Sequence, residues 1–452
     1  MLAAFTALHA LMHSRDPRAA WGWIATCWLA PILGPVLYLL FGVHRVPTRR
    51  ARNSRSTALR PSAIPTLTHS LPRELEELVR IGDAVTGRRL SQDNHVALLH
   101  NGDEAYPAML RAIDGAQRSI LLSTYIFRGD DTGRAFASLL GRARRRGVDV
   151  KVLVDAVGDL YYWPRGSDRL RDEGVEVQHF QLGRRYLPLP RLNLRNHRKL
   201  LVIDDEVAYL GGLNIGDHHW SHGSSHPALD MHFEVRGAVL ADLRAVFQED
   251  WCTAGGTALP AAAPAPPATQ AGHSCRVVTD GPLEEPSLLE LILLGALANA
   301  HDRVSIVTPY FVPMAALSRG LEAAALRGVN VTLVLPERSN LPWVDWASRR
   351  WLESLLERGV KVILHPSFVH TKMFVVDGFY AQIGSANLDA RSLRLNFELN
   401  MELYSPEIAG QLQSHFNELC RAGRPLELVD LNRLGTWPRV RNAVCWLFSA
   451  YL

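Results

Sequence analysis

The sequence repeats one arrangement of segments. Ser119–Phe127 (SILLSTYIF) is matched by Val304–Val312 (VSIVTPYFV), and Arg146–Asp155 (RGVDVKVLVD) is matched by Arg327–Pro336 (RGVNVTLVLP). The second pair is separated by slightly fewer residues than the first, a small drift that loops of different length produce between diverged copies. An internal duplication of this size predicts two lobes of similar fold.

Each copy alternates strand-like and helix-like segments. Val148–Asp155 has the β-branched residues of a buried strand, and Gly133–Arg146 before it has the spacing of an amphipathic helix. Strands that alternate with helices predict a largely parallel sheet covered on both faces. We therefore expect an α/β fold of two lobes packed against each other. The 452 residues, 47% of them hydrophobic, can bury the large core that this fold requires.

One short motif occurs at matching places in both copies. The pattern H-x-K-x4-D appears as HRKLLVID at residues 197–204 and as HTKMFVVD at residues 370–377. After six further residues, the first is followed by Gly-Gly-Leu-Asn and the second by Gly-Ser-Ala-Asn. The spacing between the two motifs continues the drift between the copies. Two matched motifs with the same sequel are far rarer by chance than one and indicate a functional site.

Lysine is nearly absent outside this motif. Only four of the 49 basic residues are lysines, Lys151, Lys199, Lys361 and Lys372, and the second and fourth occupy the motif. An ammonium group is a compact point charge, whereas a guanidinium is a planar fork with different hydrogen-bonding geometry. The bias indicates that these two positions require an ammonium group.

These motifs are identified as those of the phospholipase D superfamily, and the sequence resembles bacterial cardiolipin synthases over nearly the whole chain. The segments that carry the resemblance are Trp21–Val43, Tyr125–Phe127, Arg195–Lys199, Thr308–Pro313 and Gly384–Ser392. The resemblance implies paired α/β lobes that form one pseudo-symmetric catalytic unit, with one active site at their interface and neither a metal nor another cofactor. It also implies transfer of a phosphatidyl group between two phosphatidylglycerol molecules, which gives cardiolipin and glycerol.

The chemistry of the motif fits this reaction. Side chains on a strand repeat every two residues, so His197 and Lys199 point to the same side, as do His370 and Lys372. One imidazole can attack phosphorus and form a phosphohistidine while the other moves a proton between the glycerol oxygens. The motifs are nearly symmetric, so the order of roles rests on the family resemblance, which implies His197 as nucleophile and His370 as general acid and base.

Other positions of the two motifs supply contacts to the phosphoryl group. The motif lysines would neutralise its oxygens as charge develops. Asn214, Asn387 and Ser385 are candidate phosphate-binding residues. Ser385 is matched by Gly212 in the first copy, so the two half-sites are not identical.

Acidic residues have two candidate roles. The motif acids Asp204 and Asp377 are candidate catalytic residues, with bracing of the loop after the strand as the alternative. A neutral nucleophilic imidazole also needs an acceptor at its second nitrogen. A Phe-Glu-(Val/Leu) triplet recurs at matching places in the two copies and makes Glu234 and Glu398 the candidates for orienting the histidines. Asp230 is the alternative in the first copy.

The N-terminus predicts a membrane anchor. Trp21–Val43 contains no charged side chain, and a helix of this length, at about 1.5 Å per residue, would cross about 30 Å of hydrocarbon, kinked by its prolines and glycines. With the apolar Met1–Met12, it predicts either a helical hairpin or a single span. The arginines from Arg45 to Arg60 place the catalytic lobes on the cytoplasmic side of the bacterial inner membrane by the positive-inside rule.

Changes in composition divide the chain. The predicted divisions are a membrane anchor at 1–45, a basic juxtamembrane linker at 46–95, a first phospholipase D-like lobe at 96–254, an Ala/Pro-rich linker at 255–272, a second such lobe at 273–425 and a C-terminal tail at 426–452. The end of the tail is apolar and aromatic, which predicts either core packing or a membrane-surface segment.

The distribution of charge bears on the alternative functions. The net charge is +4, but residues 1–60 hold eight arginines and one aspartate, so the rest of the chain is slightly acidic. A nuclease needs a basic groove, so we expect phosphatidylglycerol and anionic membrane lipids as partners, and no nucleic acid. A phospholipase D-type hydrolase or nuclease is the alternative, because water could resolve the same phosphohistidine. A third alternative, a non-catalytic membrane scaffold, is disfavoured because both motifs are intact.

Three further features have structural interpretations. The histidine cluster of the segment HHWSHGSSH has no acidic or cysteine partner at ligand spacing, so no metal site is predicted at His218, His219, His222 and His226. Tyr125 and Tyr310 predict core aromatic residues, with headgroup contacts as the alternative. The five cysteines are scattered and odd in number, which argues against a disulfide framework.

Overall fold

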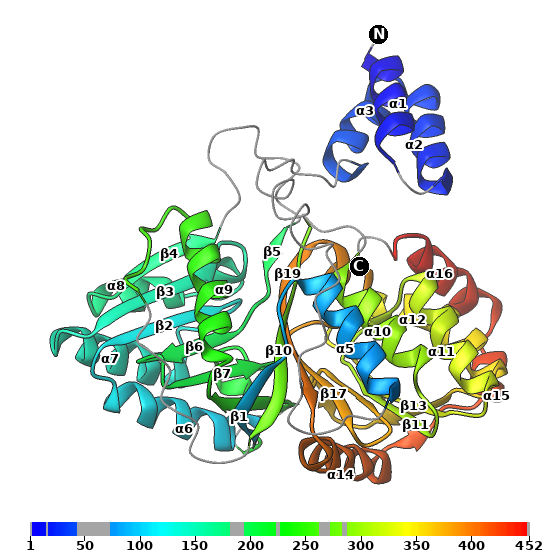
Figure 1. Ribbon diagram of the computed structural model, residues 1–452. Helices are drawn as coiled ribbons and strands as arrows, with labels where there is room; N and C mark the ends of the chain where they lie inside the picture. The colour runs from blue at the N-terminus through cyan, green and yellow to red at the C-terminus, as the bar shows by residue number, and fades with distance from the viewer. Residues whose placement is uncertain are drawn as a thin grey trace.

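The computed structural model describes residues 2–14, 17–42, 73–180, 194–222, 227–261, 272–282 and 287–449. Its body contains two α/β lobes that share one 16-stranded sheet. Figure 1 shows them side by side, the first mainly in cyan and green and the second in yellow to red. Strands β1 (Ser91–His100) and β10 (His273–Asp280) pair antiparallel in the middle of the sheet and join the lobes.

The strand order outward from this junction is equivalent in the two lobes. In the first lobe, β1 is followed by β9 (Met231–Arg236), β7 (Val207–Gly211), β6 (Leu200–Ile203), β2 (Ser119–Thr124), β3 (Asp149–Asp155) and β4 (Glu176–Phe180). In the second lobe, β10 is followed by β19 (Asn396–Tyr404), β17 (Tyr380–Gly384), β16 (Met373–Val376), β11 (Arg303–Val307), β13 (Asn330–Pro336), β14 (Lys361–His365) and β20 (Arg424–Pro425). This equivalence confirms the predicted α/β fold of two similar lobes.

The sheet is mixed, so the expectation of a largely parallel sheet is wrong for the half of each lobe that carries the motif. Strands β2, β3 and β4 run parallel, as do β11, β13 and β14. The motif strands β6 and β16 instead pair antiparallel with both neighbours. Each leads into a tight turn that begins at Asp204 or Asp377, both with positive φ. A short turn can join only antiparallel neighbours, whereas a helical crossover joins parallel ones.

Helices cover both faces of the sheet. Helices α9 (Leu240–Thr253) and α14 (Pro406–Ala422) bury a core that contains residues of both lobes. The opposite face is covered in the first lobe by α6 (Asn101–Gly115), α7 (Asp131–Arg145) and α8 (Gly166–Asp172), and in the second by α10 (Leu288–Ala298), α11 (Ala315–Leu326) and α12 (Pro342–Glu357). Because one core runs through both lobes, they pack as a unit.

Two segments outside the expected lobe boundaries also belong to the body. Helix α5 (Arg73–Thr86) falls within the expected linker 46–95, yet it packs against α10 through buried Leu78 and Val79. An ion pair between Asp83 on α5 and buried Arg276 on β10 fixes it to the second lobe. In the expected tail, α15 (Leu428–Asn432) and α16 (Thr436–Leu447) pack against α12. Both segments carry apolar residues that the second lobe covers.

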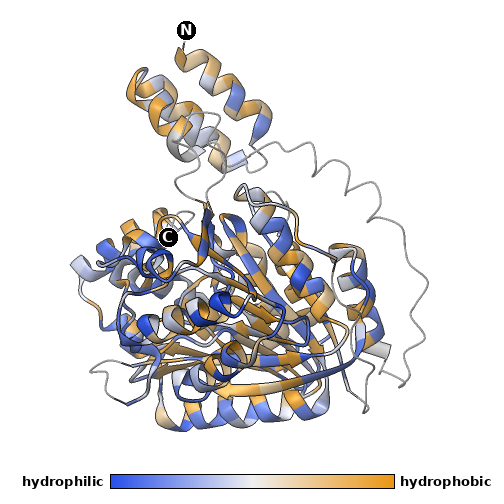
Figure 2. Ribbon diagram, turned by 90° about the vertical axis from the view of Figure 1, so that its left-hand side faces the viewer, coloured by the Kyte–Doolittle hydropathy of each residue, from blue (hydrophilic) through white to orange (hydrophobic). Residues whose placement is uncertain are grey.

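The N-terminal residues form short helices instead of one kinked span. Helices α1 (Leu2–His13) and α2 (Pro17–Leu29) pack side by side, and a turn then leads into α3 (Leu33–Leu37) and a π-helical turn (Tyr38–Gly42). Gly34 allows this return, because a Cβ there would lie 2.3 Å from the Thr26 carbonyl oxygen. Figure 2 shows these helices as predominantly hydrophobic. Within the described ranges, none of the helices has both the length and the apolar character that spanning a bilayer requires.

Candidate active site

Each motif histidine follows a short strand that crosses to the other lobe. Strand β5 (Arg195–Asn196) pairs with the start of β19, and β15 (Phe368–Val369) pairs with β8 (Ala228–Leu229). The backbone N–H of His197 donates to the carbonyl of Phe397 at 2.9 Å, and that of His370 donates to the carbonyl of Leu229 at 2.6 Å. Both histidines are therefore held at the seam between the lobes.

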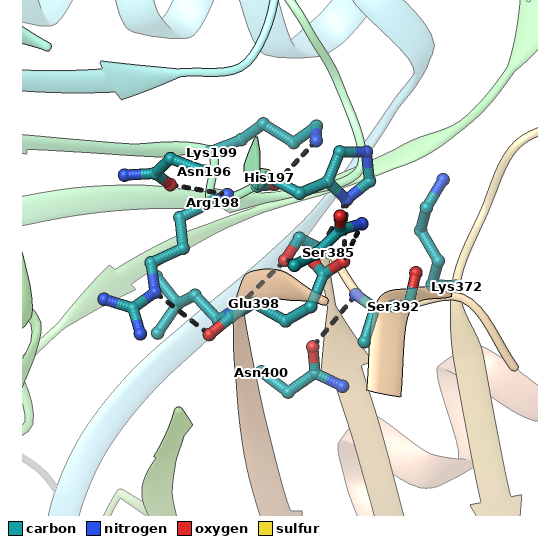
Figure 3. Close-up of polar contacts among 12 residues, drawn as sticks. Asn196, His197, Arg198, Lys199, Lys372, Ser385, Ser392, Glu398 and Asn400 are labelled. Carbon is teal, nitrogen blue, oxygen red and sulfur yellow. Dashed lines mark hydrogen bonds and ion pairs between the residues drawn. The ribbon is translucent and has the colours of Figure 1, made fainter. Parts of the chain in front are cut away.

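A carboxylate from the opposite lobe binds each imidazole. Nδ1 of His197 lies 3.0 Å from each carboxylate oxygen of Glu398 on β19, as Figure 3 shows. Nδ1 of His370 lies 2.6 Å from Oδ2 of Asp230, which precedes β9. Both acids are buried. An Nδ1–H that donates to a carboxylate leaves the lone pair of Nε2 for chemistry.

The structure corrects the assignment of Glu234. This side chain accepts a hydrogen bond from the Tyr209 hydroxyl at 3.0 Å and pairs with Arg236 at 2.9 Å. The recurring Phe-Glu triplet is misleading, because backbone pairing aligns Asp230, and not Glu234, with Glu398. The N–H of Gly212 donates to the carbonyl of Met231, the residue after Asp230. In the other lobe, the N–H of Ser385 donates to the carbonyl of Leu399, the residue after Glu398. The alternative, Asp230, is therefore the residue that orients the second histidine.

The motif lysines are buried beside the imidazoles. Nζ of Lys199 donates to the carbonyl of His197 at 2.7 Å, and Nζ of Lys372 donates to that of His370. Figure 3 shows the two ammonium groups on either side of the His197 ring. Burial lowers the pKa of Lys199 to about 7 and that of Lys372 to about 8, although nearby Glu398 and Asp230 oppose the change. A phosphate anion bound between them would favour the charged form of both lysines.

The electrostatics of the site favour neutral imidazoles. Burial is the largest cause that lowers the pKa of His197, opposed by the charge of Glu398. Burial and then the charge of Lys372 lower the pKa of His370 to about 4. Although burial opposes it, the charges of His370 and Lys372 hold the pKa of Asp230 well below its usual range. At pH 7 both rings are therefore uncharged and Asp230 is ionised, the states that a nucleophilic imidazole and its supporting acid need.

The two half-sites differ in how the carboxylate is held. The Ser385 hydroxyl donates to Glu398 and accepts the N–H of Leu399 at 3.0 Å, so it supports the acid. A Cβ at Gly212 would lie 2.2 Å from Oδ1 of Asp230. The shorter aspartate thus occupies the space that the serine side chain fills in the other half. The pair Ser385 and Glu398 in one half-site and the pair Gly212 and Asp230 in the other therefore fill equivalent space.

The asparagines that follow the two motifs are both buried. Oδ1 of Asn214 accepts the N–H of Ile126 at 3.3 Å, while its own backbone N–H donates to Nε2 of His219 at 3.2 Å. Oδ1 of buried Asn387 has no hydrogen-bond partner among the residues that the structure describes. A side-chain amide can present either its donor or its acceptor to a ligand. Asn387 is therefore a polar group suited to contact a ligand.

The motif acids brace the fold and do not contact the imidazoles. Asp204 accepts three backbone N–H groups, those of residues 117 to 119, at 2.7 to 2.8 Å. Asp377 accepts the equivalent three, of residues 301 to 303, at 2.8 to 2.9 Å. They fix the turns that lead into β2 and β11, so the structure favours the bracing alternative over a direct catalytic role.

Two further residues belong to the site. Arg198, the variable residue of the first motif, is buried against Asp250 at 2.7 Å and donates to the backbone carbonyl of Glu398 at 3.1 Å. It fastens the crossing strand to both lobes. The ring of Tyr125 lies 5.1 Å from that of His197 in an edge-on arrangement, so this tyrosine lines the site and is not a core residue. Arg198 occupies the variable position of the motif, so the motif pattern did not point to it.

The histidine cluster lies partly at the site. The ring of buried His219 is 5.9 Å from that of His370, and the ring of His218 is 4.0 Å from that of His219. Burial lowers the pKa of His218 to about 3. His226 lies outside the described residues. Within those that are described, no group of three or more histidine, cysteine or acidic side chains is arranged to hold a metal ion.

Comparison with known proteins agrees with this geometry. Residues 109–251 and 293–420 match the family described as "Cardiolipin synthase, PLD-like domain", and residues 1–42 match one described as "Phospholipase_D-nuclease N-terminal". Cardiolipin synthase A of Pseudomonas aeruginosa is 34% identical over 92% of this chain and 88% of its own length. Cardiolipin synthase of Geobacillus thermodenitrificans is 31% identical over 99% of this chain and 92% of its own length.

A solved structure shares the fold. The phosphatidylserine synthase of Haemophilus influenzae superposes with a TM-score of 0.64 and 15% identity, covering 84% of this chain and 100% of that one. The matched family segments contain both motifs and both orienting carboxylates. The chain therefore belongs to the family of cardiolipin synthases with phospholipase D-like domains.

Proposed function

We propose that the protein transfers a phosphatidyl group from one phosphatidylglycerol to another through a phosphohistidine, and releases glycerol. The observation that carries this proposal is the pair of carboxylate-bound imidazoles at one seam, with two buried lysines beside them. One imidazole can serve as nucleophile while the other moves the proton. The lysines supply positive charge where the phosphoryl oxygens would lie.

The first half-reaction displaces glycerol. Nε2 of His197 attacks the phosphorus of the first phosphatidylglycerol, the bond from phosphorus to the glycerol oxygen breaks, and His370 gives a proton to that oxygen. The products are a phosphatidyl group on His197 and free glycerol. A bound phosphate anion raises the pKa of His370 above its value without phosphate, which lets the ring carry this proton.

The second half-reaction forms cardiolipin. Neutral His370 accepts the proton of a hydroxyl group on the second phosphatidylglycerol, whose oxygen attacks phosphorus and releases His197. Each Nδ1–H stays bonded to its carboxylate, Glu398 or Asp230, which stabilises the ring when it becomes cationic. Assignment of the nucleophile to His197 follows the family resemblance.

The N-terminal helices are proposed to lie in the cytoplasmic membrane of a bacterium. Their surface is apolar: among the large side chains that they expose are Leu2, Phe5, Leu8, Leu11, Met12, Trp21, Trp28, Leu29, Ile32, Leu33, Val36 and Leu39. Exposing so many apolar side chains to water is energetically unfavourable, and a lipid bilayer would cover them. By the positive-inside rule, the arginines between residues 45 and 60 support a cytoplasmic position for the catalytic lobes.

The experiment that tests this function uses the purified chain in phosphatidylglycerol vesicles with a metal chelator. We expect cardiolipin and glycerol in equal amounts, measured by lipid mass spectrometry and a glycerol assay. Phosphatidic acid as the sole lipid product would establish the hydrolase alternative instead. A second reaction with phosphatidylethanolamine added would show whether that lipid also accepts the phosphatidyl group.

Replacing Gly212 with alanine should lower turnover on the order of 10²-fold, because the new Cβ displaces Asp230 from His370 and small misplacements at a reacting group have effects of that size. The added methyl would sit 2.2 Å from the carboxylate. Gly410→Ala is the matched control, since a Cβ at this exposed helical position meets nothing within 4 Å. Equal activity of both variants in the cardiolipin assay would contradict the proposed packing.

A further inference from the structure

Two exposed apolar elements flank the active site, one from each lobe. The first is the rim loop, which we define as residues 160–163, Leu-Tyr-Tyr-Trp, shortly after β3. These four consecutive side chains are 39 to 83% exposed, and Trp163 is the most exposed of them. Aromatic side chains at successive positions of a soluble surface are unusual, because exposed rings are normally scattered.

The rim loop is attached to the active site. The hydroxyl of Tyr161 is 3.0 Å from that of Tyr125, whose ring stands 5.1 Å from His197. Only one side chain therefore separates the loop from the proposed nucleophile. Tyr162 is covered on one face by the guanidinium of Arg128, at 3.8 Å from the ring centroid.

Helix α16 provides the second element. Trp437, Val440, Val444 and Leu447 follow one another at helical spacing and are 47 to 82% exposed, so they form one stripe. The other side of the helix packs on α12, where Cys445 joins an apolar cluster that includes Tyr310. Figure 1 shows α16 at the same end of the body as β5 and the start of β19, which position His197.

Arginines lie beside both elements. Arg128 and Arg165 flank the rim loop, and Arg165 lies 5.9 Å from the Trp163 ring. From Arg433 to Ser449 the chain has three arginines and no acidic residue. Exposed tryptophan and tyrosine combined with arginine is the composition that membrane–water interfaces select, and arginine adds attraction to anionic headgroups.

We propose that the rim loop and α16 form a docking surface for an anionic phospholipid bilayer. This surface would hold the catalytic body on the membrane separately from the N-terminal helices, with the active site opening toward the headgroups. The proposal rests on the proposed function, because a lipid substrate must pass from the bilayer to the buried histidines. It adds the residues through which the body meets that bilayer.

The kinetic test compares two forms of one substrate. The full-length variants Trp163→Ser and Trp437→Ser are assayed on phosphatidylglycerol in vesicles and on short-chain phosphatidylglycerol dissolved as monomers. We expect each variant to lose on the order of tenfold on vesicles, the effect of removing one buried aromatic contact, and to match the wild type on the monomeric lipid. Leu326→Ser is the control, since Leu326 is 70% exposed at the end of α11 and belongs to neither element.

A second measurement does not depend on turnover. Hydrogen exchange of residues 158–165 and 436–447 is followed in nanodiscs of phosphatidylglycerol, in nanodiscs of phosphatidylcholine and in detergent. Exchange that is slower only in the phosphatidylglycerol nanodiscs supports docking, even if the wild type forms no cardiolipin. Unchanged exchange overturns the proposal, as does equal loss of activity on vesicles and monomers. If an added protein, and not lipid, slows the exchange of these residues, the surface binds a protein partner and the bilayer proposal is overturned.

Discussion

Replacing His197 with alanine is expected to abolish formation of cardiolipin, with turnover lower by on the order of 10⁴-fold or more. The alanine removes the lone pair that attacks phosphorus, and no described side chain in the site can supply an equivalent one with the same carboxylate support. His370 is bonded to a different acid from the other lobe. The measurement is cardiolipin released per minute from phosphatidylglycerol vesicles by the full-length variant.

The order of the two histidines can be tested in the same experiment. Acid-quenched enzyme is digested, and the motif peptides are examined by mass spectrometry for a phosphatidyl adduct. We expect the adduct on the peptide that contains His197. In His370→Ala we expect it to form more slowly and then to persist, because the variant lacks the acid for the first step and the base for the second. An adduct on His370 would reverse the two roles while leaving the reaction itself intact.

Substituting Asp230 with asparagine should have the second largest effect, a loss on the order of 10³- to 10⁴-fold, because an amide does not hold the imidazole in the required tautomer. The carboxylate lies 2.6 Å from Nδ1 of His370 and accepts a hydrogen bond from the Nδ1–H. The isosteric change leaves the surrounding packing in place. Steady-state turnover and the pH profile of the variant measure the effect.

Glu234→Gln is the matched control for this substitution. Glu234 lies close to Asp230 along the chain and is also acidic, but it bonds to Tyr209 and Arg236 instead of a histidine. We expect near wild-type turnover, with thermal unfolding measured for both variants to separate folding from chemistry. A disabled Glu234→Gln with an active Asp230→Asn would show that the orienting acid has been assigned to the wrong residue.

Much of the site could be predicted because its residues are close together in sequence. His197 and Lys199 lie on one extended segment with a single residue between them, so the strand period alone places their side chains on one side. The second motif repeats this arrangement, and the same argument predicts His370 with Lys372. The duplication itself follows from the matching segments, whose spacing drifts only slightly along the chain.

The pairing of each histidine with its acid could not be predicted in the same way. Glu398 is 201 residues from His197, and Asp230 is 140 residues before His370. The repeated Phe-Glu-(Val/Leu) triplet matches Glu234 with Glu398 in sequence. The backbone hydrogen bonds between strands instead make Asp230 the structural equivalent of Glu398. Similar letters can recur by chance over a short triplet, but hydrogen-bonded register is decided by the whole strand and its neighbours.

The two lobes, the repeated histidine and lysine pairs, and the acidic body behind an arginine-rich end can be read from the sequence. The fold is needed to show that each histidine is held against the opposite lobe and binds an acid there, and that the motif aspartates brace turns. These contacts join residues that lie far apart along the chain. Local spacing fixes which side chains share a strand face, while contacts between distant residues depend on how the strands pair and how the cores pack.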